Sequence, residues 1–515
     1  MGESNRARYS SGSLTWRTIG LASVMAYCAL IDLPAGFANE SDPMITGTLP
    51  RGEEVTRQGH SLEMQHEAPP GRLLVLGFVG DLGFSGKDQP LSTAGAVRHG
   101  RVIPWADLTA GIAQLLDADA TFANLETVIT DRSDLGPTDK AFNFAASSAG
   151  LKQAIKAGIN VMAAANNHAA DYGEQGIADT LRHLEAARTD GLKAYAGLGM
   201  GDERYRADTF ELQGVSVGLA AVGKGINPAG ADGYGQPLYA SPLDFQRASG
   251  LLGKTGADVR VLSVHYNQEL SLLPAVADTK RLRSAIDRGD ATIVFGHHSH
   301  VSSGVERRGD GVIFYGLGNF LHAGTQNMVG YGQCRDFGLH ARVYMWVAPG
   351  DKPILRAVEI TPIMDMHEIA KPFPAKEASS RIAIVNAMSK ELSRDGGDPL
   401  YFVPTSSGSG LACIQDPTTY GDELDARCKA QLSPLLNVAS EPAVSLASCK
   451  PLPQVEVAAG SQKNNVKPVA LEEQSGKLSK SPKKQAGKKI NKATIPAAKG
   501  KKKSAGRLFL FSRTD

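Results

Sequence analysis

Residues 72–79 read RLLVLGFV and are followed at once by Gly80-Asp81, and this stretch decides the fold. A near-continuous apolar run is typical of a strand buried on both faces, because each face must be shielded from water. Asp81 then places a carboxylate just beyond the carboxyl end of that strand. Ligands of open α/β sheets gather at this edge, although a single Asp after a strand can also cap a helix. The stretch therefore predicts both a sheet core and a binding edge.

Apolar runs and stretches of helical spacing alternate along the following part of the chain. Strands are expected at residues 120–125, 159–164, 215–222, 258–264, 291–295, 312–315 and 338–347, and helices at 105–116, 151–157, 176–187, 280–287 and 381–392. Repetition of this kind over about 290 residues predicts a layered α/β domain.

The composition divides the chain into five parts. We expect a signal peptide or N-terminal anchor at residues 1–38, a linker at 39–70, the α/β domain at 71–365, a small Cys-containing appendage at 366–453 and a disordered Lys-rich tail at 454–515. The leader combines basic residues, a short apolar run and small residues at a cleavage point. The body is therefore predicted to be exported, to the periplasm or another extracytoplasmic space.

Charge and cysteine usage agree with export. Residues 461–515 hold fifteen Lys or Arg and three acidic residues, so with a net charge of +2 this tail carries +12 and the rest −10. Beyond the leader an even number of cysteines remains, and the sequence leaves their pairing open: Cys334, Cys413, Cys428 and Cys449. Even cysteine numbers in an exported chain indicate disulfides.

Polar side chains recur where the predicted strands end. These positions carry carboxylate, amide or imidazole groups: Asp81, Asn124, Glu126, Asn167, His168, His265, His297, His298, His300 and Asn319. A lone histidine such as His265 is more often a hydrogen-bonded residue than a ligand. Three imidazoles within four positions, however, would destabilise a buried strand end unless they had partners. Their spacing lets two of them reach one ion, so we expect a metal site at this edge.

The mixture of ligand types indicates which ions would fit. Carboxylate, amide and imidazole groups together suit Mn²⁺, Fe or Zn²⁺ better than Mg²⁺ or Ca²⁺, and one or two ions are compatible with them. Two ions would clamp the attacking and leaving oxygens of a phosphate ester. The expected metal ligands are Asp81, Asn124, Glu126, Asn167, His265, His297, His298 and His300. Asn167 and His168 are the expected catalytic residues, the latter to protonate or orient a leaving group.

These motifs, in this order, resemble the CapA family of capsule biosynthesis, also called the PgsA-type poly-γ-glutamate synthesis proteins. The residues that match are Gly80-Asp81, Ala123-Asn124-Leu125-Glu126, Asn166-Asn167-His168, Asp171-Tyr172-Gly173, His265 with Glu269, residues 296–301 and Gly318-Asn319-Phe320. The resemblance spans residues 73–362. It implies a branch of the calcineurin-like metallophosphatases, with a layered β-sandwich flanked by helices. One departure stands out: ordinary metallophosphatases have Asp-x-His in the first motif, whereas Gly83 occupies the third position here.

Two functions of different classes are compatible with these observations. The first is a metal-dependent, phosphoesterase-like hydrolase acting on a phosphoester or an anionic envelope polymer. The second is a non-catalytic polymer-binding component of a polyglutamate or capsule export apparatus, within a capsule synthesis complex. The basic tail can attract polyanions or lipid headgroups at a membrane surface, or be a solvated tail with no partner. Nucleic acid is not expected as a partner of an exported protein.

Overall fold

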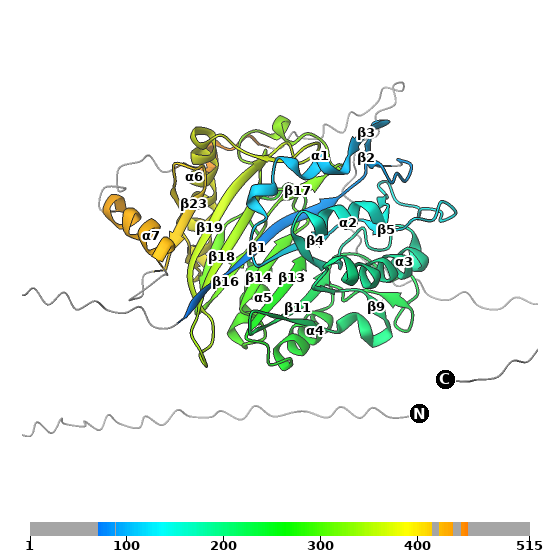
Figure 1. Ribbon diagram of the computed structural model, residues 1–515, viewed down its shortest axis with the longest axis horizontal. Helices are drawn as coiled ribbons and strands as arrows, with labels where there is room; N and C mark the ends of the chain where they lie inside the picture. The colour runs from blue at the N-terminus through cyan, green and yellow to red at the C-terminus, as the bar shows by residue number, and fades with distance from the viewer. Residues whose placement is uncertain (1–70, 88, 415–421, 436–443, 452–515) are drawn as a thin grey trace, which may run out of the picture. The chain divides into compact units, whose positions relative to one another are not determined.

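The computed structural model describes residues 71–87, 89–414, 422–435 and 444–451 (Figure 1). The expected leader, the linker and the basic tail lie outside these residues. Among the described residues, no helix combines the length and the apolar character needed to cross a membrane. The prediction of a mixed α/β domain is confirmed.

The first of two large sheets contains the strand that opens the domain. Within the described residues this sheet has ten strands, on the path β22 (Val403–Pro404), β23 (Gly410–Cys413), β19 (Ile354–Met364), β18 (Gly338–Val347), β1 (Arg72–Gly83), β4 (Ala120–Leu125), β7 (Ile159–Ala163) and β8 (Ala194–Ala196), with β17 (Asn319–His322) beside β1 and β20 (Lys371–Pro372) beside β19. β1 is parallel to β4 and β17 and antiparallel to β18.

The second sheet has seven strands within the same described residues. Their order is β10 (Asp208–Leu212), β11 (Val215–Gly223), β13 (Val259–His265), β14 (Ile293–His297), β16 (Gly311–Phe314), β15 (Val305–Arg308) and β21 (Asp398–Pro399). β11, β13, β14 and β16 run parallel to one another. Their carboxyl ends therefore lie at one edge of the sheet.

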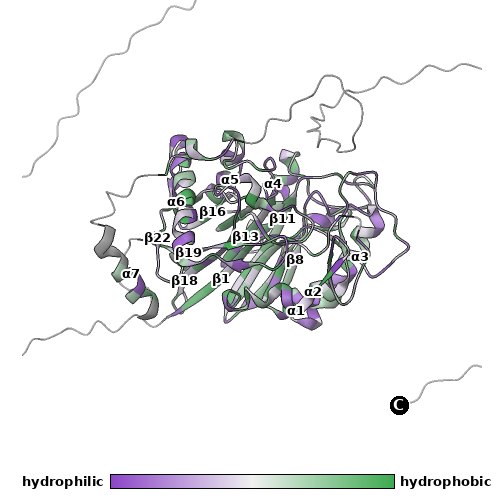
Figure 2. Ribbon diagram, turned by 90° about the horizontal axis from the view of Figure 1, so that it is seen from above, coloured by the Kyte–Doolittle hydropathy of each residue, from purple (hydrophilic) through white to green (hydrophobic). Residues whose placement is uncertain are grey.

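The two sheets pack face to face through aromatic side chains. Phe78 of β1 lies 5.4 Å from Phe295 of β14 and 5.8 Å from Phe314 of β16, measured between ring centroids. All three rings are fully buried, and each such ring contributes roughly 1.5–3 kcal/mol through burial. Figure 2 shows hydrophobic strands at the centre, with more hydrophilic helices around them. This shared core fixes the edges of the two sheets relative to each other.

Helices cover the outer faces of both sheets. α1 (Trp105–Ala110), α2 (Ser148–Lys156) and α3 (Gly173–Ala186) pack on the first sheet, and α4 (Pro242–Lys254) and α5 (Val276–Asp287) on the second. The helix expected at residues 105–116 is wrong in its second half, because Gly111 follows α1 and a short 3₁₀ turn, η1 (Ala113–Leu115), comes next. A Cβ on Gly111 would lie 2.5 Å from the Ala370 carbonyl oxygen, so a neighbouring chain segment crowds the break.

α4 was not predicted from the sequence, although its start carries recognisable signals. The Ser241 hydroxyl accepts a hydrogen bond from the Asp244 backbone N–H at 3.2 Å, and Pro242 occupies the first helical position. A serine cap followed by proline is a common helix start. Its apolar face packs Phe245 and Leu252 against the second sheet.

The region after residue 365 is built onto both sheets, since β21 pairs with β15 of the second sheet. β20 and β23 pair with β19, and α6 (Ala375–Leu392) buries Ile382 and Val385 in the shared core. Disulfides join Cys334 to Cys449 and Cys413 to Cys428, which resolves the pairing that the sequence left open. The second of them fastens α7 (Asp422–Leu435) to β23.

A buried ion pair joins α5 to β15. Nε of Arg283 donates to Oε1 of Glu306 at 2.9 Å, and its Nη2 donates to Oε2 at 2.8 Å. The Tyr315 hydroxyl also donates to Oε2, and Arg283 Nη1 donates to the Asp395 carbonyl oxygen. This carboxylate is therefore fully satisfied without any solvent contact.

We expect Arg283→Met to destabilise the protein by about 3–5 kcal/mol, because it leaves a buried carboxylate without its charge partner. The matched control is Arg308→Met, which breaks the half-exposed ion pair with Asp287 and should cost about 0–1 kcal/mol. Denaturant unfolding of the two variants and the wild type measures both changes. Equal losses in the two variants would contradict the prediction.

Candidate metal centre

The carboxyl ends of strands from both sheets meet at one edge (Figure 1). In the first sheet, Asp81 of β1 stands in register with Asn124 of β4 and with Asn319 of β17. In the second sheet, His265 of β13 stands in register with His297 of β14. The two sets touch, because Nδ1 of His297 lies 2.9 Å from Oδ1 of Asp81. The packing of the sheets thus gathers groups that are far apart in the sequence.

The glycine of the Gly80-Asp81 motif permits this approach. The backbone N–H of Asp81 donates to the Gly318 carbonyl oxygen at 3.0 Å. A Cβ on Gly80 would lie 1.8 Å from that same oxygen, which no side chain can tolerate. Glycine is therefore required where the end of β1 meets the turn before β17.

Asp81 is the acceptor at the centre of a buried hydrogen-bond network. Nδ2 of Asn124 donates to Oδ1 of Asp81 at 2.9 Å and lies 3.1 Å from Nδ1 of His265. The backbone N–H of His298 reaches Oδ2 of Asp81 at 3.4 Å. Asn124 therefore presents its amide nitrogen to the other groups, so it acts here as a link between the two sheets.

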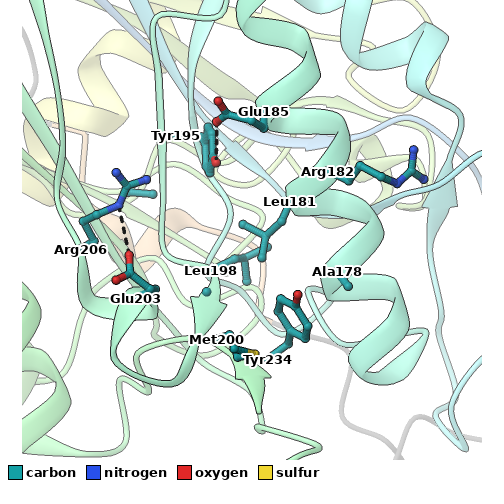
Figure 3. Close-up of a pocket in the computed structure, with 12 residues that line it drawn as sticks. Ala178, Leu181, Arg182, Glu185, Tyr195, Leu198, Met200, Glu203, Arg206 and Tyr234 are labelled. Atoms are coloured by element: carbon teal, nitrogen blue, oxygen red, sulfur yellow. Dashed lines mark hydrogen bonds and ion pairs between the residues drawn. The ribbon is translucent and has the colours of Figure 1, made fainter. Parts of the chain in front are cut away.

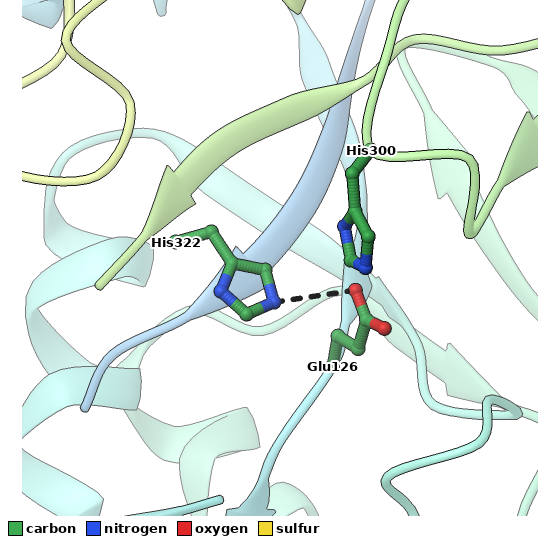
Figure 4. Close-up of side chains that lie close together, drawn as sticks. All are labelled: Glu126, His300 and His322. Carbon is green, nitrogen blue, oxygen red and sulfur yellow. Dashed lines mark ion pairs between the residues drawn. The ribbon is translucent and has the colours of Figure 1, made fainter. Parts of the chain in front are cut away.

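Glu126 is the most exceptional group of the site. Its side chain is 0% exposed, and neither oxygen has a hydrogen-bond partner among the described residues. Imidazole nitrogens surround it: Nε2 of His265 lies 3.5 Å from Oε1, and Nε2 of His322 lies 3.4 Å from Oε2 (Figure 4). An isolated buried carboxylate is strongly unfavourable, so this arrangement calls for a cation.

Further imidazoles complete the surroundings of Glu126. Nε2 of His265 lies 2.6 Å from Oδ1 of Asn167 and 3.1 Å from Nδ1 of His298. Nδ1 of His300 lies 2.8 Å from Oδ1 of Asn319, which orients that ring. These contacts hold the rings in place around the carboxylate.

His168 has a carboxylate partner of its own. Its Nδ1 lies 2.7 Å from Oδ2 of Asp171, and its Nε2 faces Oε1 of Glu126 at 4.0 Å. In the preceding Asn-Asn pair, Asn166 has a structural role, because its Oδ1 accepts from the His168 backbone N–H and its Nδ2 donates to the Leu125 carbonyl oxygen. Only Asn167 points towards His265.

The loop after β14 is strained at the histidines. His298 has a φ of 85° and His300 a φ of 57°, both in the left-handed region that non-glycine residues rarely adopt. Such backbone strain costs of order 1–3 kcal/mol per residue and gathers at functional sites. Here the strain accompanies the convergence of the two imidazoles on the cluster.

Burial sets the protonation of the site. Burial and the neighbouring Asp81 charge raise the pKa of Glu126 well above its usual value. Burial also opposes ionisation of Asp81, but contact with His297 outweighs it and the pKa of Asp81 falls well below its usual range. Burial lowers the pKa of His265 and His298 well below normal. Neutral imidazoles keep a lone pair for a metal ion, which is the form that ligation requires.

Three groups of side chains place one ligand atom each within 4.8 Å of the others. They are Glu126 with His265 and His298, Glu126 with His300 and His322, and Glu269 with His298 and His300. The unpartnered oxygens of Glu126 and the neutral imidazoles show that the donor set fits a divalent transition metal.

The structure brings all the residues predicted from the sequence into this one cluster. His322 and two lysines at the rim of the site were not predicted from the sequence. Lys224 places Nζ 3.2 Å from Nε2 of His298, and Lys140 donates to the Asn167 carbonyl oxygen at 2.7 Å. Strand alternation gives no signal for His322, because it follows the site residue Asn319 by three positions in β17.

A surface hollow of about 380 Å³ lies elsewhere, beside α3 and β9 (Gly199–Met200), and is lined by none of the cluster residues (Figure 3). Four of its polar side chains form two pairs with one another. The Tyr195 hydroxyl donates to Glu185 at 3.0 Å, and Arg206 lies 3.6 Å from Glu203. This hollow therefore offers no comparable set of unsatisfied ligand atoms.

Residues 75–323 match the family model described as bacterial capsule synthesis protein PGA_cap. The PGA biosynthesis protein CapA of Bacillus subtilis (strain 168) is 30% identical over 282 residues, which cover 54% of this chain and 68% of that protein. The chain belongs to the PGA_cap family. The match extends over the whole cluster, from Asp81 to His322.

Two further PGA_cap relatives are more distant. The capsule biosynthesis protein CapA of Bacillus anthracis is 28% identical over 215 residues, covering 40% of this chain and 51% of the relative. A probable polyglutamine synthesis accessory protein of Mycobacterium tuberculosis (strain CDC 1551 / Oshkosh) is 26% identical over 228 residues, covering 42% and 59%. The chain thus spans between half and two thirds of the length of these relatives.

We expect Glu126→Gln to leave the metal-free protein at least as stable as the wild type, because it removes a buried carboxylate without a partner. The variant should lose the stabilisation that Mn²⁺ or Zn²⁺ gives the wild type, which is about 2.7 kcal/mol at a hundred times the dissociation constant. Thermal unfolding with and without each ion measures both effects. Glu185→Gln, at the separate hollow, is the control. An unchanged metal response in Glu126→Gln would contradict the assignment.

Proposed function

We propose that this PGA_cap protein is an exported, metal-dependent hydrolase of the phosphoesterase type that acts in capsule or cell-envelope polymer biosynthesis. The observation that carries the proposal is the buried carboxylate of Glu126, which lacks hydrogen bonds among the described residues and is surrounded by imidazoles. The names of the relatives supply the biological setting, since they refer to capsule, PGA or polyglutamine synthesis.

The proposed ligands favour Mn²⁺, Fe or Zn²⁺, because imidazole and carboxylate groups dominate the set. When bound, such an ion polarises a phosphoryl or carbonyl oxygen and makes bound water a nucleophile near neutral pH. Glu126, His265 and His298 would hold the ion, with the carbonyl oxygen of the Asn167 side chain next to them. The face-to-face sheets with outer helices support the assignment of a metallophosphatase-like β-sandwich.

His168 is proposed to handle a proton at the leaving group. Asp171 fixes its ring through Nδ1 at 2.7 Å and itself accepts from the Phe144 backbone N–H at 2.7 Å. This leaves Nε2 directed into the site, towards Glu126. A ring held in one orientation is what general acid–base catalysis or substrate orientation requires.

The rim of the site favours an anionic substrate. Lys224 is exposed and lies beside His298, and Lys140 forms an ion pair with Asp171 next to Asn167. Two ammonium groups at the mouth of a metal centre raise the local concentration of anions. A phosphoester or an anionic envelope polymer would satisfy this preference. The basic tail, outside the described residues, is proposed to add attraction for such a polymer, for a membrane surface or for a capsule synthesis complex.

A second candidate function is a non-catalytic polymer-binding component of an export apparatus. The amide nitrogen of Asn124 favours it, because this group donates to Asp81 and lies 3.1 Å from His265, and so competes with an ion for both. In this alternative the fold would serve as a binding surface.

We expect the wild type with Mn²⁺ or Zn²⁺ to hydrolyse bis-p-nitrophenyl phosphate or to shorten poly-γ-glutamate. His298→Ala should lower the rate at least a hundredfold, since a ligand is removed. His183→Ala, on α3 and outside the cluster, should retain the activity. Release of nitrophenol and chromatographic polymer size are the two measurements. Polymer binding without any hydrolysis, unaffected by His298→Ala, would favour the second candidate.

Export predicts that both disulfides form in the native compartment, because such bonds persist only under oxidising conditions. Peptide mapping without reduction should recover the Cys334–Cys449 and Cys413–Cys428 pairs from protein isolated from the cell envelope. Cys449→Ser should destabilise the protein by about 2–5 kcal/mol. Free thiols at all four positions in the isolated protein would contradict export.

A further inference from the structure

Gly83 lies beside His322 where β1 and β17 run in parallel. A Cβ placed on Gly83 would lie 2.6 Å from Cε1, 2.7 Å from Nδ1 and 2.9 Å from Nε2 of the His322 ring. Gly83 is the last residue of β1 and its φ lies outside the left-handed region, so its backbone conformation does not demand glycine. The imidazole of His322 thus occupies the space that a side chain at position 83 would fill.

The His322 ring has few partners in this space. It is fully buried, and neither ring nitrogen has a hydrogen-bond partner among the described residues. Its other neighbours are rings: the centroid lies 5.5 Å from that of His300 and 5.6 Å from that of Phe144, both edge-on. A buried imidazole with both nitrogens unsatisfied is unfavourable, so a partner for Nε2 is expected.

The two oxygens of Glu126 face different imidazoles. Oε1 lies 3.5 Å from Nε2 of His265, while Oε2 lies 3.4 Å from Nε2 of His322. His300 stands beside His322, and its Nδ1 is engaged by Asn319, which leaves Nε2 available (Figure 4). The Glu126 carboxylate can therefore coordinate one ion through Oε1 and a second ion through Oε2.

We propose that His322 is a metal ligand supplied by β17 in place of a side chain at position 83, and that Glu126, His300 and His322 hold a second ion beside the one held by Glu126, His265 and His298. This inference rests on the proposed metal centre. It explains why the first motif can contain Gly83 and still serve a two-ion site, because the missing imidazole comes from the neighbouring strand.

The test is the number of ions bound by the full chain, measured by elemental analysis and by calorimetric titration with Mn²⁺ and Zn²⁺. The wild type should bind two ions, and His322→Phe should bind one. His340→Phe replaces another buried histidine of the same sheet, on β18, and should still bind two. Circular dichroism and thermal unfolding confirm that the variants are folded.

Moving the imidazole provides a second, independent variant. In the double variant Gly83→His with His322→Gly, the ring is returned to β1 and the space it needs is vacated. This protein should recover the second ion, with an affinity within about tenfold of the wild type. Gly83→Ala alone should weaken the second ion, since the added methyl group displaces the His322 ring.

The outcomes separate the inference from the function on which it rests. A wild type without metal would overturn both. A wild type that binds metal, with the same count and affinity in His322→Phe, would overturn the role of His322 and leave the metal centre intact. If His322→Phe does not fold, the double variant decides, and failure of that folded protein to bind the second ion overturns the inference.

Discussion

The site depends on one constraint, a carboxylate that is sealed from water without a hydrogen bond among the described residues. Glu126 and Glu306 are both fully buried, but the side chains that contact their carboxyl groups differ. Glu306 receives an arginine and a tyrosine hydroxyl, whereas Glu126 receives only imidazoles at 3.4 Å or more. Buried polar groups nearly always have hydrogen-bond partners. The lack of such partners at Glu126, in contrast to Glu306, is therefore consistent with a role of Glu126 in binding a cation.

The two-sheet architecture makes such a group possible. Each sheet contributes only part of the ligand set: Asp81 and Glu126 come from the first, and His265 and His298 from the second. The aromatic core between the sheets positions their edges, and the loop after β14 adopts left-handed backbone at His298 and His300 to bring those rings inward. The strained loop and the buried Glu126 therefore lie at an edge that a well-packed core holds in place.

The chain after residue 365 serves the same scaffold. β20, β22 and β23 extend the first sheet, β21 extends the second, and α6 closes the shared core. The Cys334–Cys449 disulfide holds the segment around Lys450 beside Arg335, which donates to the carbonyl oxygens of Leu270 and Lys450. Leu270 in turn donates its backbone N–H to the Ser299 carbonyl oxygen, within the histidine loop. The described C-terminal segment is thus tied to the loop that presents the imidazoles.

The sequence by itself determined the buried strands, most helices and the ligand candidates from Asp81 to His300, because periodicity and strand-end position are local properties. Only the tertiary structure decided the break after α1, the disulfide pairing and the partners of Glu126. Gly83 illustrates the reason. In the sequence it is a missing side chain, but the parallel register of β1 and β17, two strands more than two hundred residues apart, fills its place with His322. Pairing between distant strands leaves no local signal in the sequence, so His322 could be assigned to the site only from the tertiary structure.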